Sequence, residues 1–377
     1  MTVPTPPPSP TPPPQPPAGA PAHALARVPN AGVQWDVEAM AATLDPARVP
    51  PAGTHEGDVD GVAAATLAPA RVPAAGAHGG DVEAVAAALG WEPGDILDLS
   101  ASFNPDAPDL AALAAGRLDS LERYPDPTAA TAAMAEALGT SPDCILLTNG
   151  GAEAIALVAN DLGRAAVPAP EFSLYARHLA AVVDPAEDPA APLIRSNPNN
   201  PTGRLARPTD AATVWDEAFY PLAAGVWSRG DVAAGRAAMA IGSLTKVFAC
   251  PGLRVGYVHA DPAVIARLAD RQPRWSLNGL AAALLPELLA RAELREWAAA
   301  TARRRAALVG AIPGVEPSDA NFALVRVEEG APAARAGLAR HGVLVRDCTS
   351  FGLPGHIRVA VPDEAGLDRL VAAWERR

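Results

Sequence analysis

The chain has 377 residues, 49% of them hydrophobic, which is enough for one large or two medium domains with true cores. Its formal net charge of −12 argues against a nucleic-acid partner or an anionic membrane surface. No apolar run reaches membrane-spanning length, and the three cysteines lie too far apart to suggest a metal site. Their odd, sparse number and the absence of a signal pattern at the N-terminus predict a cytoplasmic protein.

The N-terminal part is repetitive. Residues 1–20 are nearly half proline and predict an extended tail. Ala-Arg-Val-Pro then begins at positions 26, 47 and 70, each time followed by Ala-Gly and later by Asp-Val. Because the copies are few, short and broken by proline, a duplicated segment is favoured over a solenoid; a start codon assigned too far upstream is an alternative. We expect a disordered Pro/Ala-rich extension over residues 1–75, with only the third copy leading into folded sequence.

From about residue 90 onward, short apolar runs alternate with alanine-rich stretches of helical character. This alternation predicts an α/β fold with a mostly parallel sheet. Strands are expected at residues 145–148, 192–196, 237–243 and 254–260, and helices at residues 129–138, 152–161, 172–182 and 262–270.

The C-terminal part predicts a smaller α+β domain. A long helix over 277–309, continuous or broken, is followed by a mixture of strands (321–327, 343–348, 356–361) and helices (331–341, 363–376). The expected organisation is therefore an N-terminal arm over 76–105, a large domain over 106–285 and a small domain over 286–377.

Lys246 is the single lysine among 30 basic residues, in the stretch Gly-Ser-Leu-Thr-Lys. Chance survival under a coding bias against lysine is one interpretation. The other is chemical: a buried lysine can lose its proton and form a Schiff base with pyridoxal phosphate, whereas arginine stays protonated. The neighbouring motifs have to decide between them.

Three further motifs are individually weak. Leu-Leu-Thr-Asn-Gly-Gly at 146–151 predicts a strand, a turn and a helix N-terminus, which is either an anion site or an ordinary connection. Ser-Asn-Pro-Asn-Asn-Pro-Thr-Gly at 196–203 predicts a rigid turn with an amide free to face a ligand. Asp-Glu-Ala-Phe at 216–219 puts a carboxylate at a strand end, where α/β folds bind ligands, or else a helix N-cap.

Their order along the chain is more specific than any one of them. In that order the chain resembles fold-type I pyridoxal-phosphate enzymes, the aspartate-aminotransferase superfamily, over about residues 76–377. Within it, the chain is most similar to the threonine-phosphate decarboxylase and histidinol-phosphate aminotransferase branch. The stretches that carry this likeness are His-Gly-Gly (78–80), Asp-Leu-Ser-Ala-Ser-Phe-Asn-Pro (98–105), Arg-Tyr-Pro-Asp-Pro (123–127), Pro-Arg-Trp-Ser-Leu-Asn (273–278), Ser-Asp-Ala-Asn-Phe (318–322) and Val-Leu-Val-Arg-Asp-Cys (343–348).

The resemblance implies a set of cofactor contacts. Lys246 would bind pyridoxal phosphate covalently and move protons, Asp216 would pair with the pyridine nitrogen, and Asn200 would hydrogen-bond the phenolic oxygen. The remaining implied contacts are ring stacking by Phe172, phosphate binding by Gly150, Gly151, Ser243 and Arg254, and a contribution from Tyr124 of a second subunit in a homodimer.

The resemblance also implies substrate contacts. Arg358 would bind the α-carboxylate of a small amino acid, and Arg346 would bind a substrate phosphate. His78 and Gly79 would close over the substrate from the N-terminal arm, and no metal is implied.

Three departures from the family pattern stand out. Phe219 replaces a tyrosine that most transaminases carry, and Ser102 replaces an asparagine expected to contact substrate. The chain is also short between Phe172 and Asp216, so that a crossover helix is expected to be missing after Asn200 and the outer face of the sheet to lose cover.

The expected function is decarboxylation of O-phospho-threonine, giving aminopropanol phosphate for a cobalamin-type pathway. The alternative is an aminotransferase of the histidinol-phosphate type with a 2-oxo acid acceptor. A catalytically degenerate pyridoxal-phosphate-binding protein is a further alternative, which the retained lysine argues against.

Overall fold

The computed structural model describes residues 72–74 and 81–377. Residues 1–71 and 75 of the extension predicted over 1–75, and also His78 and Gly79, lie outside the described residues. The expectations for these segments therefore stay predictions.

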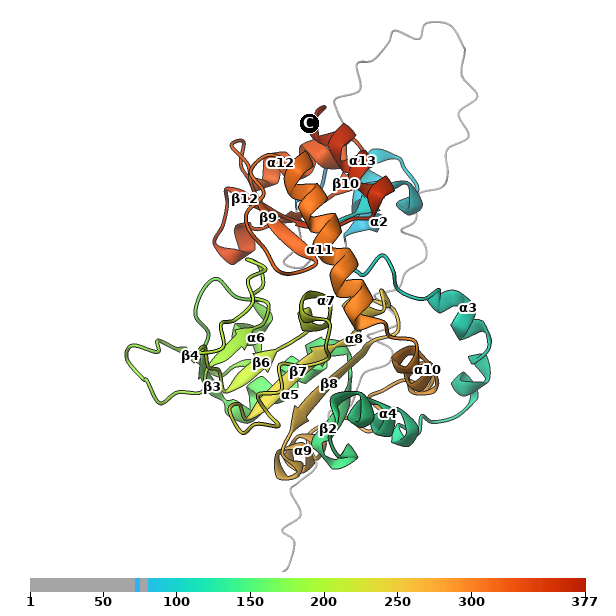
Figure 1. The fold of residues 1–377 in the computed structure, drawn as a ribbon, viewed down its shortest axis with the longest axis vertical. Helices are drawn as coiled ribbons and strands as arrows, with labels where there is room; N and C mark the ends of the chain where they lie inside the picture. Colours follow the sequence, from blue (N-terminus) through green and yellow to red (C-terminus); the bar gives the residue numbers. More distant parts are fainter. Residues whose placement is uncertain (1–71, 75–80) are drawn as a thin grey trace, which may run out of the picture. The chain divides into compact units, whose positions relative to one another are not determined.

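A five-stranded sheet forms the centre of the larger part (Figure 1). Its order is β2 (Ile145–Asn149), β8 (Val255–Ala260), β7 (Met239–Ser243), β6 (Val214–Asp216) and β5 (Ile194–Ser196). Only β8 runs against the others, so the sheet is mixed but mostly parallel, as predicted. A parallel pair, β3 (Arg164–Ala166) and β4 (Ala181–Val183), adjoins β5 through a bridge between Ala166 and Leu193.

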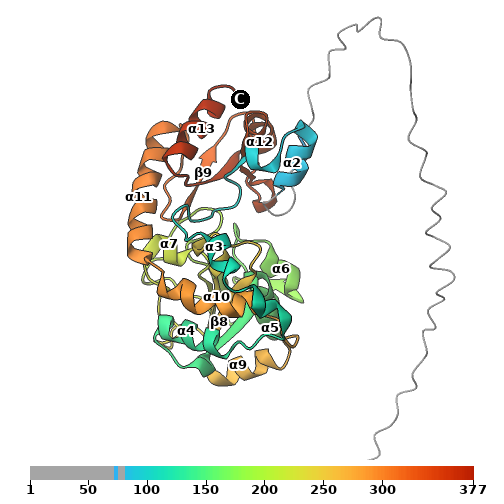
Figure 2. The same ribbon diagram turned by 90° about the vertical axis from the view of Figure 1, so that its right-hand side faces the viewer.

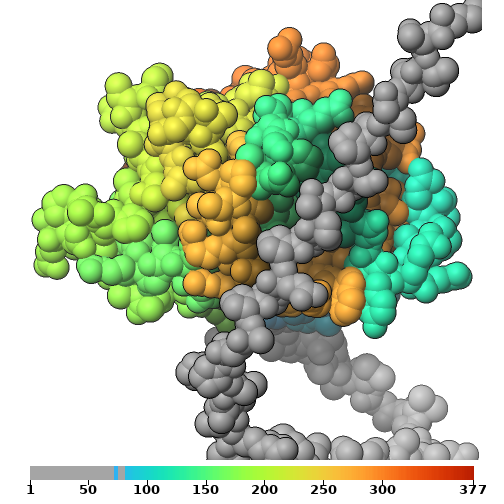
Figure 3. Space-filling view, turned by 90° about the horizontal axis from the view of Figure 1, so that it is seen from below, coloured from blue at the N-terminus to red at the C-terminus, as the bar shows by residue number. Residues whose placement is uncertain are grey.

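Helices cover both faces of this sheet because side chains alternate along its strands. Ile145 and Leu147 of β2 pack with α4 (Thr128–Leu138) and α10 (Gly279–Ala290), which lie far apart in sequence and contact each other. Figure 3 shows green and orange atoms, which belong to distant stretches of the chain, meeting on this face of the molecule. Leu146 points to the other face, into a cluster with α5 (Gly150–Leu162) and α9 (Pro262–Ala269). The sheet is thus buried on both sides, as its apolar strands predict.

The smaller C-terminal part contains an antiparallel sheet in the order β11 (Arg346–Asp347), β12 (His356–Ala360) and β9 (Phe322–Arg326). A separate parallel pair of strands, β1 (Leu97–Asp98) and β10 (Val343–Leu344), also belongs to this part of the chain. The helices are α11 (Leu294–Ala311), α12 (Ala331–Ala339) and α13 (Glu364–Trp374), which Figure 2 shows around β9. This part has the predicted α+β character; the domain boundaries themselves stay predictions.

The third repeat copy is attached to the C-terminal part. Val72 packs with Val85 of α2 (Val82–Leu89) and with Leu344 of β10 in one buried cluster. The buried Arg335 donates a hydrogen bond to the carbonyl of Pro73 and pairs with the carboxylate of Asp81. Val72 and Pro73 belong to the extension that was predicted to be disordered, whereas here both contact the C-terminal part.

The remaining described elements are short. They are the helices α3 (Leu110–Ala115), α6 (Leu174–His178), α7 (Tyr220–Ala224) and α8 (Leu244–Val247) and the 3₁₀ turns η2 (Pro93–Asp95), η3 (Leu118–Glu122), η4 (Pro142–Cys144) and η5 (Thr349–Phe351).

Two sequence predictions need correction, and for a third, the helix over 277–309, the structure decides between the continuous and the broken form that the sequence left open. The helix expected over 172–182 is only α6, because the N–H groups of Ala180 and Ala181 donate to the carbonyl of Gly163 and start β4 instead. The strand expected over 343–348 is divided between β10 and β11, which pair with different partners. The helix expected over 277–309 is broken between α10 and α11.

The connection from β5 to β6 contains no helix, as predicted, since residues 197–213 form turns and loops. The sheet is nevertheless not bare there. Trp215 of β6 is 1% exposed, and the Arg229 guanidinium carbon lies 4.9 Å from the centroid of its indole ring. Arg229 Nη2 also donates to the carbonyls of Arg207, Pro208 and Asp210, so one arginine holds the loop over the sheet. The expected loss of cover is therefore wrong.

Candidate active site

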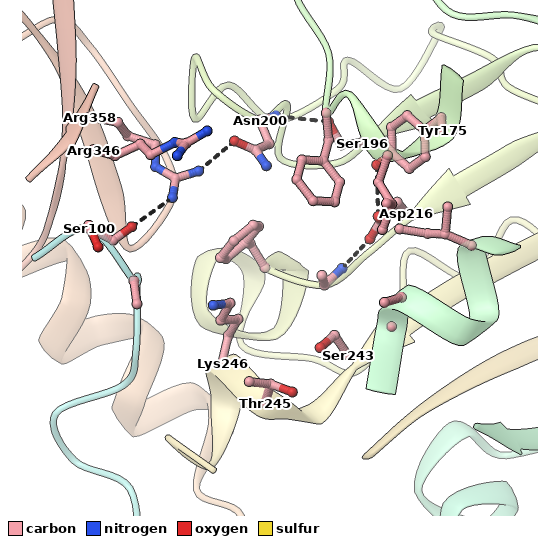
Figure 4. Close-up of a pocket in the computed structure, with 18 of the residues that line it drawn as sticks. Ser100, Tyr175, Ser196, Asn200, Asp216, Ser243, Thr245, Lys246, Arg346 and Arg358 are labelled. Carbon is pink, nitrogen blue, oxygen red and sulfur yellow. Dashed lines mark hydrogen bonds between the residues drawn. The ribbon is translucent and has the colours of Figure 1, made fainter. Parts of the chain in front are cut away.

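A cavity of about 250 Å³ lies at the carboxyl ends of β5, β6 and β7, where open α/β sheets bind ligands. Figure 4 shows that side chains from the central sheet line one side and side chains from the C-terminal sheet the other. The residues that line it include Ser196, Asp216 and Ser243, which are the last residues of these three strands.

Lys246 stands in α8, directly after β7, and its side chain enters the cavity. The Nζ atom lies 4.6 Å from the ring centroid of Phe103. Burial, and then the positive charge of Arg358, lower the pKa of Lys246 to about 8. A neutral, nucleophilic amine is therefore accessible near physiological pH, which no arginine at this position could supply.

Asp216 is 7% exposed at the end of β6. Its Oδ2 accepts a hydrogen bond of 2.7 Å from the Tyr175 hydroxyl, and its Oδ1 accepts one of 3.0 Å from the Ala218 N–H. Burial raises the pKa of Asp216, while these two donors lower it. The sequence analysis does not single out Tyr175, whose position three residues after Phe172 was the available signal.

The N-terminus of α5 forms a cradle of small groups. Gly150 has φ 74°, and a Cβ atom there would collide with the Arg254 guanidinium. A Cβ atom on Gly151 would lie 3.1 Å from the Cβ of Ser243. Arg254 is itself a non-glycine residue at positive φ, 56°, a strained conformation that is typical of functional sites. Unpaired N–H groups beside an arginine and a serine favour an anion.

Asn200 and Phe172 flank the same cavity from the turn after β5 and from the segment before α6. The Oδ1 atom of Asn200 accepts a hydrogen bond of 2.6 Å from Nη1 of Arg358. The Phe172 ring meets Tyr175 edge-on, with 5.9 Å between the ring centroids. Both predicted residues are thus at the cavity.

Arg346 and Arg358 are directly opposite each other on β11 and β12. They are 4% and 7% exposed, and both line the cavity. Nη2 of Arg358 donates to the carbonyl of Ser100, while its Nε is buried with no hydrogen-bond partner among the described residues. Burial lowers the pKa of Arg358 to about 10. Like charges in opposed positions destabilise a sheet, so the pair favours a bound anion.

Of three further residues named in the sequence analysis, Tyr124 and Ser102 do not line the cavity and Phe219 does. Tyr124 is 76% exposed and stacks on Trp275, with 4.3 Å between the ring centroids. Ser102 is fully buried and does not line the cavity, whereas Phe219 lines it and packs edge-on against Phe322. Ser100, Thr245 and Phe351 line the cavity without having been singled out in the sequence.

The donor set fits pyridoxal phosphate. A buried amine of lowered pKa suits the aldehyde carbon, a buried carboxylate suits a protonated ring nitrogen, and the cradle at Gly150 and Gly151 suits a phosphate. The chemistry of these residues is the ground for this fit.

Comparisons with known proteins agree. The sequence model of the family Aminotransferase class I and II matches residues 158–373. The chain is 31% identical to the histidinol-phosphate aminotransferase of Symbiobacterium thermophilum, covering 74% of this chain and 90% of that one. It is also 31% identical to the threonine-phosphate decarboxylase of Salmonella typhimurium, covering 76% and 92%. The first alignment runs over 331 positions, more than 74% of 377 residues, so it contains positions where this shortened chain has no residue.

Solved structures show the same fold. The histidinol-phosphate aminotransferase of Clostridium acetobutylicum matches with a TM-score of 0.65 and 22% identity, covering 74% of this chain and 98% of that one. The L-threonine-O-3-phosphate decarboxylase of Porphyromonas gingivalis matches with a TM-score of 0.63 and 24% identity, with the same coverage. Among the described helices, none combines the length and apolarity needed to cross a bilayer. The chain belongs to the class I and II aminotransferase family and is a pyridoxal-phosphate-dependent enzyme, an aminotransferase or a decarboxylase.

Proposed function

We propose that the enzyme acts on a small L-amino acid that carries a second anionic group, most simply a phosphate. The observation that carries this proposal is the pair Arg346 and Arg358, two buried guanidinium groups in directly opposed positions beside the buried amine. Two such charges are held together at a cost unless anions bind between or beside them.

In this proposal Arg358 takes the α-carboxylate. Its two terminal nitrogens are held by Asn200 and Ser100, which fixes the plane of the guanidinium, and its buried Nε still lacks a partner among the described residues. Arg346 takes the phosphate; its Nη2 donates to Ser350 Oγ at 2.9 Å, which holds the side chain against η5.

The cofactor contacts in this proposal are those that the family resemblance implies. Pyridoxal phosphate, when bound, supplies the electron sink for bond breaking at the substrate Cα. Lys246 holds it covalently and is placed to move a proton at Cα, Asp216 holds the ring nitrogen, and Asn200 and Phe172 bind the ring. Gly150, Gly151, Ser243 and Arg254 hold its phosphate.

The best candidate reaction is decarboxylation of O-phospho-threonine, in a pathway of the cobalamin type. Phe219 favours it, because a phenylalanine lacks the hydroxyl that most transaminases present at this position. Transamination of the histidinol-phosphate type is the second candidate, since relatives of both kinds match at the same identity.

We also propose a cytoplasmic homodimer in which Tyr124 reaches the partner's site. Four exposed apolar side chains support an interface: Leu118, Leu121, Tyr124 and Trp275 are 55–76% exposed. Trp275 has φ 56°, a strained conformation for an exposed tryptophan that a contact with a partner would explain. A monomer in sedimentation-velocity runs of the cofactor-loaded protein at micromolar concentration would contradict the dimer.

One experiment tests the reaction. The purified protein is loaded with pyridoxal phosphate and incubated with O-phospho-L-threonine, alone or with 2-oxoglutarate. Release of carbon dioxide without consumption of the 2-oxo acid is the expected result. Conversion of 2-oxoglutarate to glutamate means transamination, and neither product in the presence of a stable visible cofactor band removes phospho-threonine as the substrate.

A further inference from the structure

Glu171 lies just outside the cavity, between Pro170 and Phe172, and joins two of its parts. Its carboxylate accepts hydrogen bonds from the Ser196 N–H (2.8 Å) and from the Ser196 hydroxyl (2.5 Å). Next to it, Asn199 Nδ2 donates to the carbonyl of Pro170 at 3.1 Å. The segment that carries Phe172 is therefore fastened to the end of β5 and to the turn after it by the half-buried Glu171 carboxylate and by Asn199.

The contact continues across the cavity. The hydroxyl of Ser196 donates to Glu171 and accepts from the Asn200 N–H at 2.8 Å. The Asn200 side chain in turn accepts from Arg358, on the C-terminal sheet (Figure 4). Glu171, Ser196, Asn200 and Arg358 thus form one chain of hydrogen bonds from the central sheet to the C-terminal sheet. The link passes through Asn200, whose backbone N–H bonds Ser196 and whose side-chain Oδ1 bonds Arg358, so a fixed backbone at Asn200 fixes where its side chain starts.

We propose that Glu171 is a positioning residue: its ionised carboxylate orients Asn200 through Ser196, and thereby sets the Arg358 guanidinium that binds the substrate carboxylate. This inference rests on the proposed function in that Arg358 must bind a carboxylate. Glu171 itself touches neither substrate nor cofactor.

The charge state of Glu171 is open to change near neutral pH. Burial raises its pKa to about 7, against hydrogen bonds from Ser196 and Phe172, and the Asp216 carboxylate raises it further. The groups that face it are Asp216 from β6, Tyr175 from α6 and Ser196 from β5. Above pH 7 the carboxylate accepts both Ser196 donors. Below pH 7 one of the two oxygens carries a proton and no longer accepts, so the N–H and the hydroxyl of Ser196 compete for the remaining acceptor and the hydroxyl is held less firmly toward Asn200.

Glu217 provides a matched control. It is also buried, its pKa is also raised to about 7 by burial, and it also lies near Asp216. Its Oε1, however, accepts from the Arg229 N–H at 2.9 Å, and Ser228 also hydrogen-bonds its side chain. It has no part in the hydrogen-bond chain to Arg358, so a general effect of a buried acid near Asp216 can be separated from the positioning role.

The test measures the binding of succinate, a non-reacting dicarboxylate, to the cofactor-loaded enzyme by calorimetry between pH 8 and pH 6. For wild type and Glu217→Gln we expect the affinity to fall about tenfold as the pH drops through 7, the effect of losing one charged hydrogen bond. For Glu171→Gln we expect the weaker affinity at every pH, since an amide resembles the protonated acid. The visible cofactor band should be equal in all three proteins.

The outcomes separate the two proposals. Either of two results overturns the positioning role and leaves the substrate site intact. One is a succinate affinity that still depends on pH in Glu171→Gln. The other is the loss of that pH dependence in both variants. No succinate binding by wild type at any pH overturns the proposed carboxylate site and the inference with it. If Glu171→Gln does not retain the cofactor, Ser196→Ala removes the same relay; a wild-type pH profile in that variant overturns the inference.

Discussion

The two walls of the cavity are built in different ways. The central-sheet wall, which contains Lys246, Asp216, Ser243 and Gly151, takes its groups from strand ends and from the first turn of a helix, so that backbone geometry fixes them. The C-terminal-sheet wall presents two arginines on short strands whose charges repel. A rigid, locally encoded wall suits a cofactor that stays bound, whereas a wall of like charges needs its ligand and suits a substrate that comes and goes.

The comparison of the two walls predicts that the largest loss of turnover follows from replacing Lys246. Lys246→Arg keeps the positive charge and removes the amine that can be neutral, so covalent attachment of pyridoxal phosphate should disappear. Turnover should fall at least about 100-fold, the lower end of what one positioned acid–base group supplies. Visible absorbance after extensive dialysis, with mass spectrometry of the borohydride-reduced protein, is the measurement. A retained covalent adduct in the variant would show that another residue holds the cofactor.

On the opposite wall, Arg358→Met should leave the cofactor band intact and weaken the binding of O-phospho-L-threonine about 100-fold, because charged hydrogen bonds are lost. Titration followed by the change in visible absorbance measures it. An equal loss of cofactor and of substrate affinity would mean that the two walls do not have separate tasks.

The pH dependence of the rate of cofactor capture tests the lowered pKa of Lys246. Since the pKa of Lys246 is lowered to about 8, its neutral fraction falls about tenfold for each pH unit below 8. The rate at which the cofactor-free protein captures pyridoxal phosphate should rise with that slope from pH 6 and level off above pH 8. In Arg358→Met the plateau should move to higher pH, since Arg358 is one cause of the lowered value. A plateau already at pH 6 would contradict this assignment.

Arg346 should have a smaller and more selective effect. In Arg346→Gln the preference for O-phospho-L-threonine over L-threonine should shrink about tenfold, while the affinity for L-threonine stays the same. Competition binding to the cofactor-loaded enzyme gives the ratio. An unchanged ratio would place the phosphate elsewhere.

The loop over β6 lies outside both walls and should affect stability alone. Arg229→Met leaves Asp231 and three backbone carbonyls without this donor and should lower the free energy of unfolding by about 3 kcal/mol. Arg236→Met is the control, because Arg236 pairs with the same Asp231 but its side chain is 59% exposed; about 1 kcal/mol or less is expected. Urea unfolding measures both, and turnover per folded molecule should be unchanged.

The motifs predicted much of the central-sheet wall because each combines a strand end with a turn. Lys246, Asp216, Asn200 and Gly151 lie at one cavity for that reason. Tyr175 was missed although it follows Phe172 by three residues, since its contact with Asp216 spans 41 residues and no local pattern shows it. The division of 343–348 into two strands depends on β1 and β12, which local propensity does not contain.

Arg229 has a consequence for how such a short chain can arise. A lineage that already had an arginine over Trp215 could lose a crossover helix and still keep the indole covered. In the reverse order, the intermediate would carry an exposed tryptophan on an open sheet and would tend to aggregate. We therefore expect the substitution to precede the deletion, so that reconstructed ancestors with the helix already contain the arginine.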